Sequence, residues 1–191
     1  MRVMAADTRD RILDALETLL LDDGTDKATL EAVASRAGVS KGGLLYHFPS
    51  KDAMMAALVR RLGERSDVQR VEAEAAGTSL AQWYLQPPDA SSAEEVALYR
   101  STLAALRSID GRPGEVQQAV IDVMGMWDRA LQREVTDPVQ AEIVRLVGDG
   151  IYLAALLGLP HTPPDLHRDV VERLLGGGSS SVDPSGQGSA G

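Results

Sequence analysis

The 191-residue chain contains no cysteine, which excludes disulfides, thiolate metal sites and cysteine nucleophiles. Aromatic residues make up only 4% of the chain, with a single Phe, and histidine occurs three times. No apolar run approaches the roughly 18 residues that a membrane span needs. The first residues, MRVMAADTRDRI, also lack the apolar stretch of a secretory signal. We therefore expect a soluble, cytoplasmic protein.

The chain has 44% apolar and 25% charged residues, as expected for one or two globular domains with a real core. Its net charge of −9, from 19 basic and 28 acidic residues, argues against a protein that is basic over its whole surface. The charge is uneven, because residues 36–65 hold six basic residues against two acidic ones. Such a locally basic segment suggests a face that meets a polyanion, although a solvated surface explains it equally well.

Apolar residues recur at spacings of three and four along most of the chain, which indicates helices. The predicted helices cover 7–22, 30–37, 41–47, 51–75, 80–85, 93–107, 115–135, 138–159 and 165–175. We expect N-caps at Asp7 or Thr8, Thr29, Ser40, Ser50 and Asp137. No strand-like alternation is long enough to predict a sheet, so the predicted fold class is all-α. The Gly/Ser-rich tail, residues 176–191, is expected to be disordered.

The segment from Thr29 to His47 has the pattern of a DNA-binding helix-turn-helix. Ala34 is small where the two helices must approach, and Gly38 at the turn is free to adopt a positive φ. Gly42 and Gly43 weaken the second helix by about 1 kcal/mol each relative to Ala, which makes sense where a backbone lies against another surface. The floor of a DNA major groove is such a surface. A glycine pair that packs in an ordinary helical hairpin is the alternative.

The string GVSKGGLLYHFPSKDAMMAALV, preceded by a first helix of the type TRDRILDAL, resembles the signature of the TetR family of bacterial transcriptional regulators. The resemblance covers about residues 8–62. It implies an N-terminal three-helix helix-turn-helix DNA-binding domain over 1–50 and a C-terminal helical domain over 51–175 for effector binding and dimerisation. We call these two parts the head and the body.

The resemblance also implies roles for single residues of the head. Thr29 would donate to a DNA phosphate, and Lys51 would meet another phosphate. Ser40, Lys41 and Gly42 would face the groove, with Lys41 contacting either a base edge or a phosphate. Tyr46 and His47 would hold the DNA backbone. Gly43 stands where many relatives carry a larger side chain, so few side chains remain to read bases. The implied DNA-binding residues are Thr29, Ser40, Lys41, Gly42, Gly43, Tyr46, His47 and Lys51.

Two long helices of the body are candidates for a dimer interface. The helix over 138–159 is apolar on more than one side, as expected for a helix that is central to its own domain or shared with a partner. The helix over 115–135 carries an apolar stripe of Val116, Val120, Val123, Met124, Trp127 and Leu131. The resemblance implies a homodimer in which these two helices from each copy form a four-helix interface with twofold symmetry.

A small-molecule effector is the further partner that the resemblance implies. The candidate effector-binding residues are the aromatic and sulfur side chains of the body: Trp83, Tyr84, Tyr99, Met124, Trp127 and Tyr152. Such a pocket would suit a mostly apolar, planar molecule, although the same residues could simply form core. His161 and His167 lack a third ligand nearby in sequence, so we expect no metal site and no cofactor.

The sequence contains no G-x-S-x-G motif, phosphate-binding glycine loop or H-E-x-x-H motif, so we do not expect an enzyme. The resemblance implies a ligand-responsive repressor that binds a pseudo-palindromic operator as a homodimer and that an effector releases from DNA. The alternatives are an activator, or a regulator whose body binds a protein partner or no effector.

Overall fold

The computed structural model describes residues 2–87, 101–104, 106 and 114–176, and every regular element within these ranges is an α-helix. The helices are α1 (Arg2–Asp22), α2 (Leu30–Arg36), α3 (Lys41–His47), α4 (Lys51–Ala75), α5 (Leu80–Tyr84), α7 (Glu115–Glu134), α8 (Pro138–Leu156) and α9 (Pro164–Gly176). Residues 101–104 and 106 are also helical, within the helix predicted over 93–107. The rest of that helix and the tail from residue 177 lie outside the described residues.

Side-chain caps define several helix starts, as the sequence predicts. The hydroxyls of Thr29, Ser40 and Ser50 accept hydrogen bonds from the backbone N–H three residues further on, at 3.1, 3.0 and 2.9 Å. The Asp137 carboxylate caps α8 in the same way, with Pro138 in its first turn. These local bonds satisfy N–H groups that a helix leaves without intrahelical partners.

The predicted cap of the first helix at Asp7 or Thr8 is wrong, because α1 already begins at Arg2. The preceding residues include Met and two Ala, which favour helix over a cap conformation. At the other end of the chain α8 stops at Leu156, three residues before its predicted end. Gly158 follows with a φ of +65°, a conformation that terminates helices.

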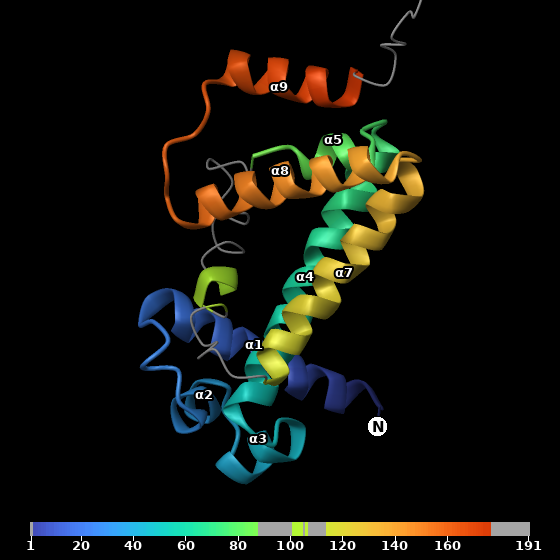
Figure 1. Cartoon of the computed structure of the whole chain (residues 1–191). Helices are drawn as coiled ribbons and strands as arrows, with labels where there is room; N and C mark the ends of the chain where they lie inside the picture. Colours follow the sequence, from blue (N-terminus) through green and yellow to red (C-terminus); the bar gives the residue numbers. More distant parts are fainter. Residues whose placement is uncertain (1, 88–100, 105, 107–113, 177–191) are drawn as a thin grey trace, which may run out of the picture.

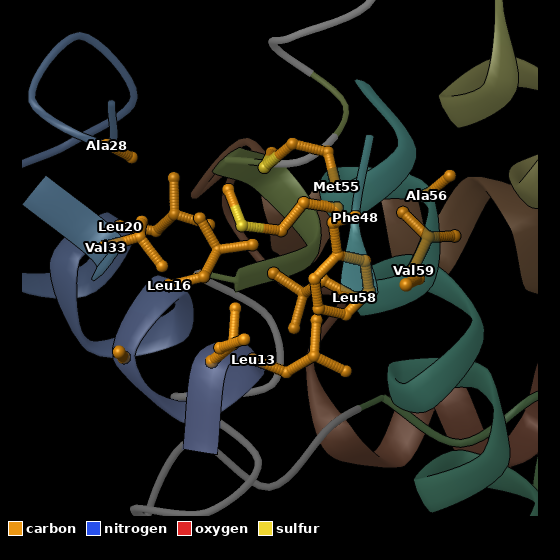
Figure 2. Packing of buried hydrophobic residues seen from close by; sticks show 14 of the residues in the cluster. Leu13, Leu16, Leu20, Ala28, Val33, Phe48, Met55, Ala56, Leu58 and Val59 are labelled. Carbon is orange, nitrogen blue, oxygen red and sulfur yellow. The ribbon is translucent and has the colours of Figure 1, made fainter. Parts of the chain in front are cut away.

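The head is built around one apolar core shared by α1, α2, α3 and the first half of α4 (Figure 2). Phe48, the only Phe of the chain, lies in this core with 2% of its surface exposed. Burial of such a side chain contributes about 3 kcal/mol to folding. Val116 and Ala119 of α7 belong to the same core, so the body is packed directly against the head.

Helices α4 and α7 lie side by side and connect the head to the remaining helices (Figure 1). Both run in the same direction, because Asp52 is paired with the backbone at Glu115, and Gly63 meets Val123 further along. A second core joins α5, the end of α7, α8 and one side of α9. No helix in the described part of the chain is long and apolar enough to cross a membrane.

Candidate functional site

The turn between α2 and α3 has the geometry that the helix-turn-helix pattern predicts. Gly38 has a φ of +65°, and the N–H of Val39 donates to the Ala34 carbonyl at 3.0 Å, which holds the two helices at a fixed angle. Leu44 is fully buried in the head core and therefore fixes which side of α3 faces inward. The opposite side of α3 is presented to solvent (Figure 1).

Most of the predicted DNA-binding residues lie on the solvent side of the head. Thr29, Ser40, Lys41, Gly42 and Tyr46 are exposed, and Tyr46 is the most open of them at 86%. Gly43, His47 and Lys51 are half-buried. The Tyr46 and His47 rings meet edge to face at 5.3 Å between centroids. The structure thus brings two helix N-termini, a lysine and an open tyrosine to one side of the head.

Two exposed cations of the head, Lys41 and Arg36, have carboxylate partners. The Lys41 Nζ lies 2.6 Å from the Glu31 Oε1, and an Arg36 guanidinium nitrogen lies 3.0 Å from the Asp22 Oδ2. The hydrogen bond from Lys41 lowers the pKa of Glu31 below its ordinary value. Glu31 was not among the residues singled out from the sequence. Glu31 lies ten residues before Lys41 and on a different helix, so the sequence does not show the spacing of three or four that indicates an ion pair within one helix.

Lys51 is held in a different way. Its Nζ donates to the Thr25 carbonyl at 3.0 Å, so the start of α4 is tied to the loop between α1 and α2. A carbonyl carries no net charge, so the ammonium of Lys51 keeps its full charge at the edge of the head.

Three of the six predicted effector-binding residues come together in the body. The Trp83 and Trp127 rings lie 4.9 Å apart between centroids, and the Tyr84 and Trp127 rings lie 6.0 Å apart. The Trp127 Nε1 is buried with no hydrogen-bond partner. Burial of an N–H without a partner is costly, which makes this group a candidate contact for a bound molecule. We call Trp83, Tyr84 and Trp127 the aromatic cluster.

A charged network that the sequence analysis did not identify supports the aromatic cluster. The Tyr84 hydroxyl donates to the Asp149 Oδ1 at 2.6 Å, and Arg145 bonds both Asp149 and Glu142 at 2.8 and 2.6 Å. Burial and the bond to Asp149 raise the pKa of the Tyr84 phenol well above its ordinary value, so this hydroxyl remains a donor. Glu142, Arg145 and Asp149 follow one face of α8, a spacing that could have indicated the ion pairs but not the tyrosine.

The other predicted effector residues are not part of the aromatic cluster as the structure describes it. Met124 is more than a third exposed on α7. Tyr152 interacts with Thr102, and burial raises the pKa of its phenol. Tyr99 lies outside the described residues. An open hollow on α9, away from the aromatic cluster, is lined by Asp169, Glu172, Arg173 and Gly176.

Polar contacts join α1 to α4 and α4 to α7. Glu17 of α1, only 9% exposed, accepts hydrogen bonds from Arg61 and Arg65 of α4 at 2.6 and 3.0 Å and from Ser101 at 3.3 Å. Asp52 of α4 accepts the backbone N–H of Glu115 at 2.7 Å. The Asp52 carboxylate therefore caps α7, whose own N-cap residue is a glycine. No group of three or more potential metal ligands occurs in the part of the chain that the structure describes.

The two predicted interface helices differ in what they leave exposed. The stripe on α7 is largely used within the chain, because Val116 and Leu131 are buried and Val120 and Val123 pack against the head core. An amphipathic stripe needs an apolar partner, and α4 of the same chain provides it. On α8, by contrast, apolar residues remain exposed at spacings of three and four: Val139, Ile143, Leu146, Leu153 and Leu157, with Gly150 between them. We call these residues the α8 stripe.

Comparison with known protein families identifies both parts of the chain. Residues 12–58 match the model of bacterial regulatory proteins of the tetR family, and residues 78–176 match the tetracyclin repressor-like C-terminal domain. The second match alone covers more than half of the chain. The chain belongs to the TetR family. This TetR-family protein is thus a transcriptional regulator with a DNA-binding helix-turn-helix, as the resemblance implied.

Curated relatives of this regulator match mainly in the head. The HTH-type transcriptional regulator UidR of Escherichia coli K12 is 33% identical over 66 residues, which cover 35% of this chain and 34% of UidR. The HTH-type transcriptional repressor BepR of Brucella suis is 37% identical over 57 residues, which cover 30% of this chain and 27% of BepR. The match therefore spans about a third or less of the length of these relatives.

Solved structures match over most of the chain. The multidrug binding protein EbrR complexed with imidazole covers 87% of this chain and 93% of its own, with 28% identity and a TM-score of 0.64. EbrR complexed with malachite green matches with 27% identity and a TM-score of 0.65, covering 87% of this chain and 96% of its own. This chain is thus similar in fold to a multidrug binding protein that was solved with imidazole and with malachite green.

Proposed function

We propose that this TetR-family regulator is a repressor that binds a pseudo-palindromic operator as a homodimer and is released by a small, mostly apolar, planar effector. The observation that carries the proposal is the exposed face of α3, held on the buried Leu44 and begun by Ser40 and Lys41. Occupancy of a promoter suffices for repression, and the similarity to BepR, a repressor, agrees with this role.

The proposed DNA contacts follow from the exposed groups of the head. The Thr29 hydroxyl accepts from the Ala32 N–H, which leaves its hydrogen available to a phosphate oxygen at the N-terminus of α2. Ser40, Lys41, Gly42 and Gly43 would lie at the major groove, and the Lys41 ammonium would contact a phosphate at its edge. Gly42 and Gly43 let the backbone approach the bases, while Tyr46, His47 and Lys51 meet the sugar-phosphate backbone.

The proposed dimer forms through the α8 stripe. Apolar residues at alternating spacings of three and four form the contact surface of paired helices. Gly150 lies in the middle of the α8 stripe and, because it has no side chain, allows two α8 helices to approach closely there. Exposed Leu166 and Val170 of α9 extend the apolar surface beside it. A twofold dimer sets two recognition helices about 34 Å apart, one turn of DNA, in successive major grooves.

The proposed effector contacts are Trp83, Tyr84 and Trp127, with Tyr99, Met124 and Tyr152 as further members. A ligand hydrogen-bond acceptor at the Trp127 Nε1 would satisfy the buried N–H of that residue. The similarity to EbrR, which binds malachite green and ethidium, supports an aromatic ligand. Both tryptophans of the chain lie in the aromatic cluster, so their fluorescence reports on this site directly.

The proposed coupling between effector and DNA runs through the contacts that join head and body. In the first route, a shift of α7 moves Asp52 and hence the start of α4 at Lys51. In the second route, the helical segment that contains Ser101 contacts Glu17 of α1. The effector releases DNA only if it binds more tightly to the dimer conformation whose head spacing does not fit the operator. The loss of DNA affinity equals this difference in effector affinity. We place the boundary between the DNA-binding head and the body at residues 50 and 51, with the tail from 176 outside both domains.

The test is a salt titration of DNA binding with duplexes from around the gene of this protein and with an unrelated duplex. A sequence preference and a slope that indicates several released counterions would support the proposal. Lys41→Ala and Tyr46→Ala should each weaken operator binding without change in helical circular dichroism. Wild-type affinity in both variants, or no binding to any duplex at low salt, would refute it.

The effector is tested on the same complex. Malachite green and ethidium, added to the protein–operator complex, should release DNA and quench tryptophan fluorescence. A ligand at 100 times its Kd also stabilises the fold by about 2.7 kcal/mol. If no apolar aromatic ligand has either effect, the body more simply serves a protein partner or no effector. A fall in transcription from the bound promoter after deletion of the gene would identify an activator instead.

A further inference from the structure

Glu31 and Lys41 form an ion pair on the face that is proposed to meet DNA. Glu31 lies in the first turn of α2, and Lys41 is the first residue of α3. Their side chains are 63% and 55% exposed, and the Lys41 Nζ is 2.6 Å from the Glu31 Oε1. The pair therefore lies on the solvent side, beside the two helix N-termini of Thr29 and Ser40.

Arg36 is paired with Asp22 in the same exposed way, but three cations of α4 are held differently. Arg61 and Arg65 are used in the half-buried contact with Glu17 that joins α1 to α4. Lys51 donates to a neutral carbonyl and so retains its charge for a phosphate. Lys41, by contrast, is the proposed groove-facing cation, and its charge is neutralised by a carboxylate of the same head.

We propose that Glu31 is a built-in competitor of DNA phosphates for Lys41. The inference rests on the proposed function, because it assigns Lys41 to the DNA complex. Before Lys41 contacts a phosphate, its ammonium must leave the Glu31 carboxylate, and that carboxylate then remains as a negative charge close to the DNA. Glu31 thus lowers the affinity of the head for every DNA duplex, including non-specific DNA.

The physical size of the effect follows from exposed ion pairs in general. Such pairs contribute up to about 1 kcal/mol, which corresponds to roughly a fivefold change in an equilibrium constant. A lysine that is not already neutralised also releases one more counterion when it meets a phosphate, so the salt slope steepens by about 0.9. The pKa of Glu31 is lowered by its bond to Lys41, so the competitor stays ionised near neutral pH.

A second role of Glu31 must be separated from this one. An acidic residue in the first turn of a helix also stabilises that helix through the helix dipole. Loss of Glu31 could therefore change DNA binding by loosening α2. A double-mutant cycle with Lys41 separates the two roles, because competition requires Lys41, whereas the effect on α2 does not.

The experiment measures binding of the full-length dimer to a fluorescein-labelled duplex from its own promoter and to a random-sequence duplex, over a range of salt concentrations. The variants are Glu31→Gln, Lys41→Ala and the double variant. Asp26→Asn is the matched control, because Asp26 is an exposed acid of the head that precedes Thr29, and its change alters net charge equally. Circular dichroism checks that each variant keeps its helices.

Glu31→Gln should bind both duplexes about two- to fivefold more tightly at low salt, with a slope steeper by about 0.9. In the Lys41→Ala background the same change should have no effect beyond that of Asp26→Asn. The inference is overturned if Glu31→Gln binds like wild type, or if its gain persists without Lys41. If Lys41→Ala itself binds DNA like wild type, the proposed DNA-binding role of Lys41 is wrong. This result refutes part of the proposed function and is distinct from a failure of the inference about Glu31.

Discussion

Gly148 of α8 lies against Tyr84 so closely that a single added methyl group should disrupt the aromatic cluster. A Cβ at position 148 would lie 2.2 Å from the Tyr84 Cδ1 and 2.8 Å from the Tyr84 carbonyl oxygen. The ring is held by its bond to Asp149, and the carbonyl belongs to the backbone of α5, so neither group turns aside easily. Gly150, two residues further on, has no atom within 4 Å of such a Cβ.

The expected magnitudes follow from these distances. Gly→Ala inside a helix gains about 1 kcal/mol from helix propensity, and this gain is shared by both positions. Overpacking at Gly148 costs about 3 kcal/mol, the upper end for an added methyl group, because a backbone oxygen is in the way. Gly148→Ala should therefore lose about 2 kcal/mol of unfolding free energy. Gly150→Ala should gain up to about 1 kcal/mol within one chain, where its Cβ meets no atom, and this gain is offset in the dimer because the methyl group opposes the close approach of two α8 helices.

Urea unfolding of both variants and the wild type, at one fixed protein concentration, measures these values. Trp83 and Trp127 are the only tryptophans, so their emission should shift in Gly148→Ala and remain unchanged in Gly150→Ala. The reasoning is refuted if Gly148→Ala is as stable as Gly150→Ala. A gain in Gly150→Ala that appears only on dilution would indicate that the methyl group hinders the dimer interface.

Three further changes test the packing of the body and its junction with the head. Glu17→Leu leaves the half-buried Arg61 with only its bond to Asp14, and should lower the unfolding free energy measured in urea by about 3 kcal/mol. A loss below about 1 kcal/mol would contradict the claim that Glu17 holds α1 against α4. Leu146→Glu introduces a charge into the α8 stripe and should give a monomer by light scattering with unchanged helicity, whereas a persistent dimer would place the interface elsewhere. Tyr84→Phe removes one hydrogen bond and should cost about 1 kcal/mol, with no cost expected if that bond does not form in solution.

Local features of the sequence were sufficient to predict the helix-turn-helix. The caps at Thr29, Ser40 and Ser50 are readable because each hydroxyl bonds an N–H only three residues away. Gly38 was readable because a sharp turn between short helices requires a positive φ. The order of residues around the second helix also sufficed to indicate the family, which the family matches confirm.

Contacts between distant parts of the chain were not predictable in the same way. Glu134 accepts the backbone N–H groups of Leu80 and Ala81, more than 50 residues away, and Tyr84 donates to Asp149 across 65 residues. A carboxylate in the sequence has the same appearance whether it is solvated or caps a remote helix. Only the packing of α5 against α7 and α8 selects the partner.

The apolar stripes of α7 and α8 also show what can be predicted from the sequence and what depends on the fold. Periodicity alone predicted two amphipathic helices and did not indicate which surface covers each stripe. The structure uses the α7 stripe against α4 and leaves the α8 stripe exposed. The sequence by itself thus determined most of the described helices, the four caps at Thr29, Ser40, Ser50 and Asp137, and the family. The tertiary structure decided which apolar faces and which charges are satisfied within one chain, because burial and ion pairing depend on residues that meet only in the folded protein.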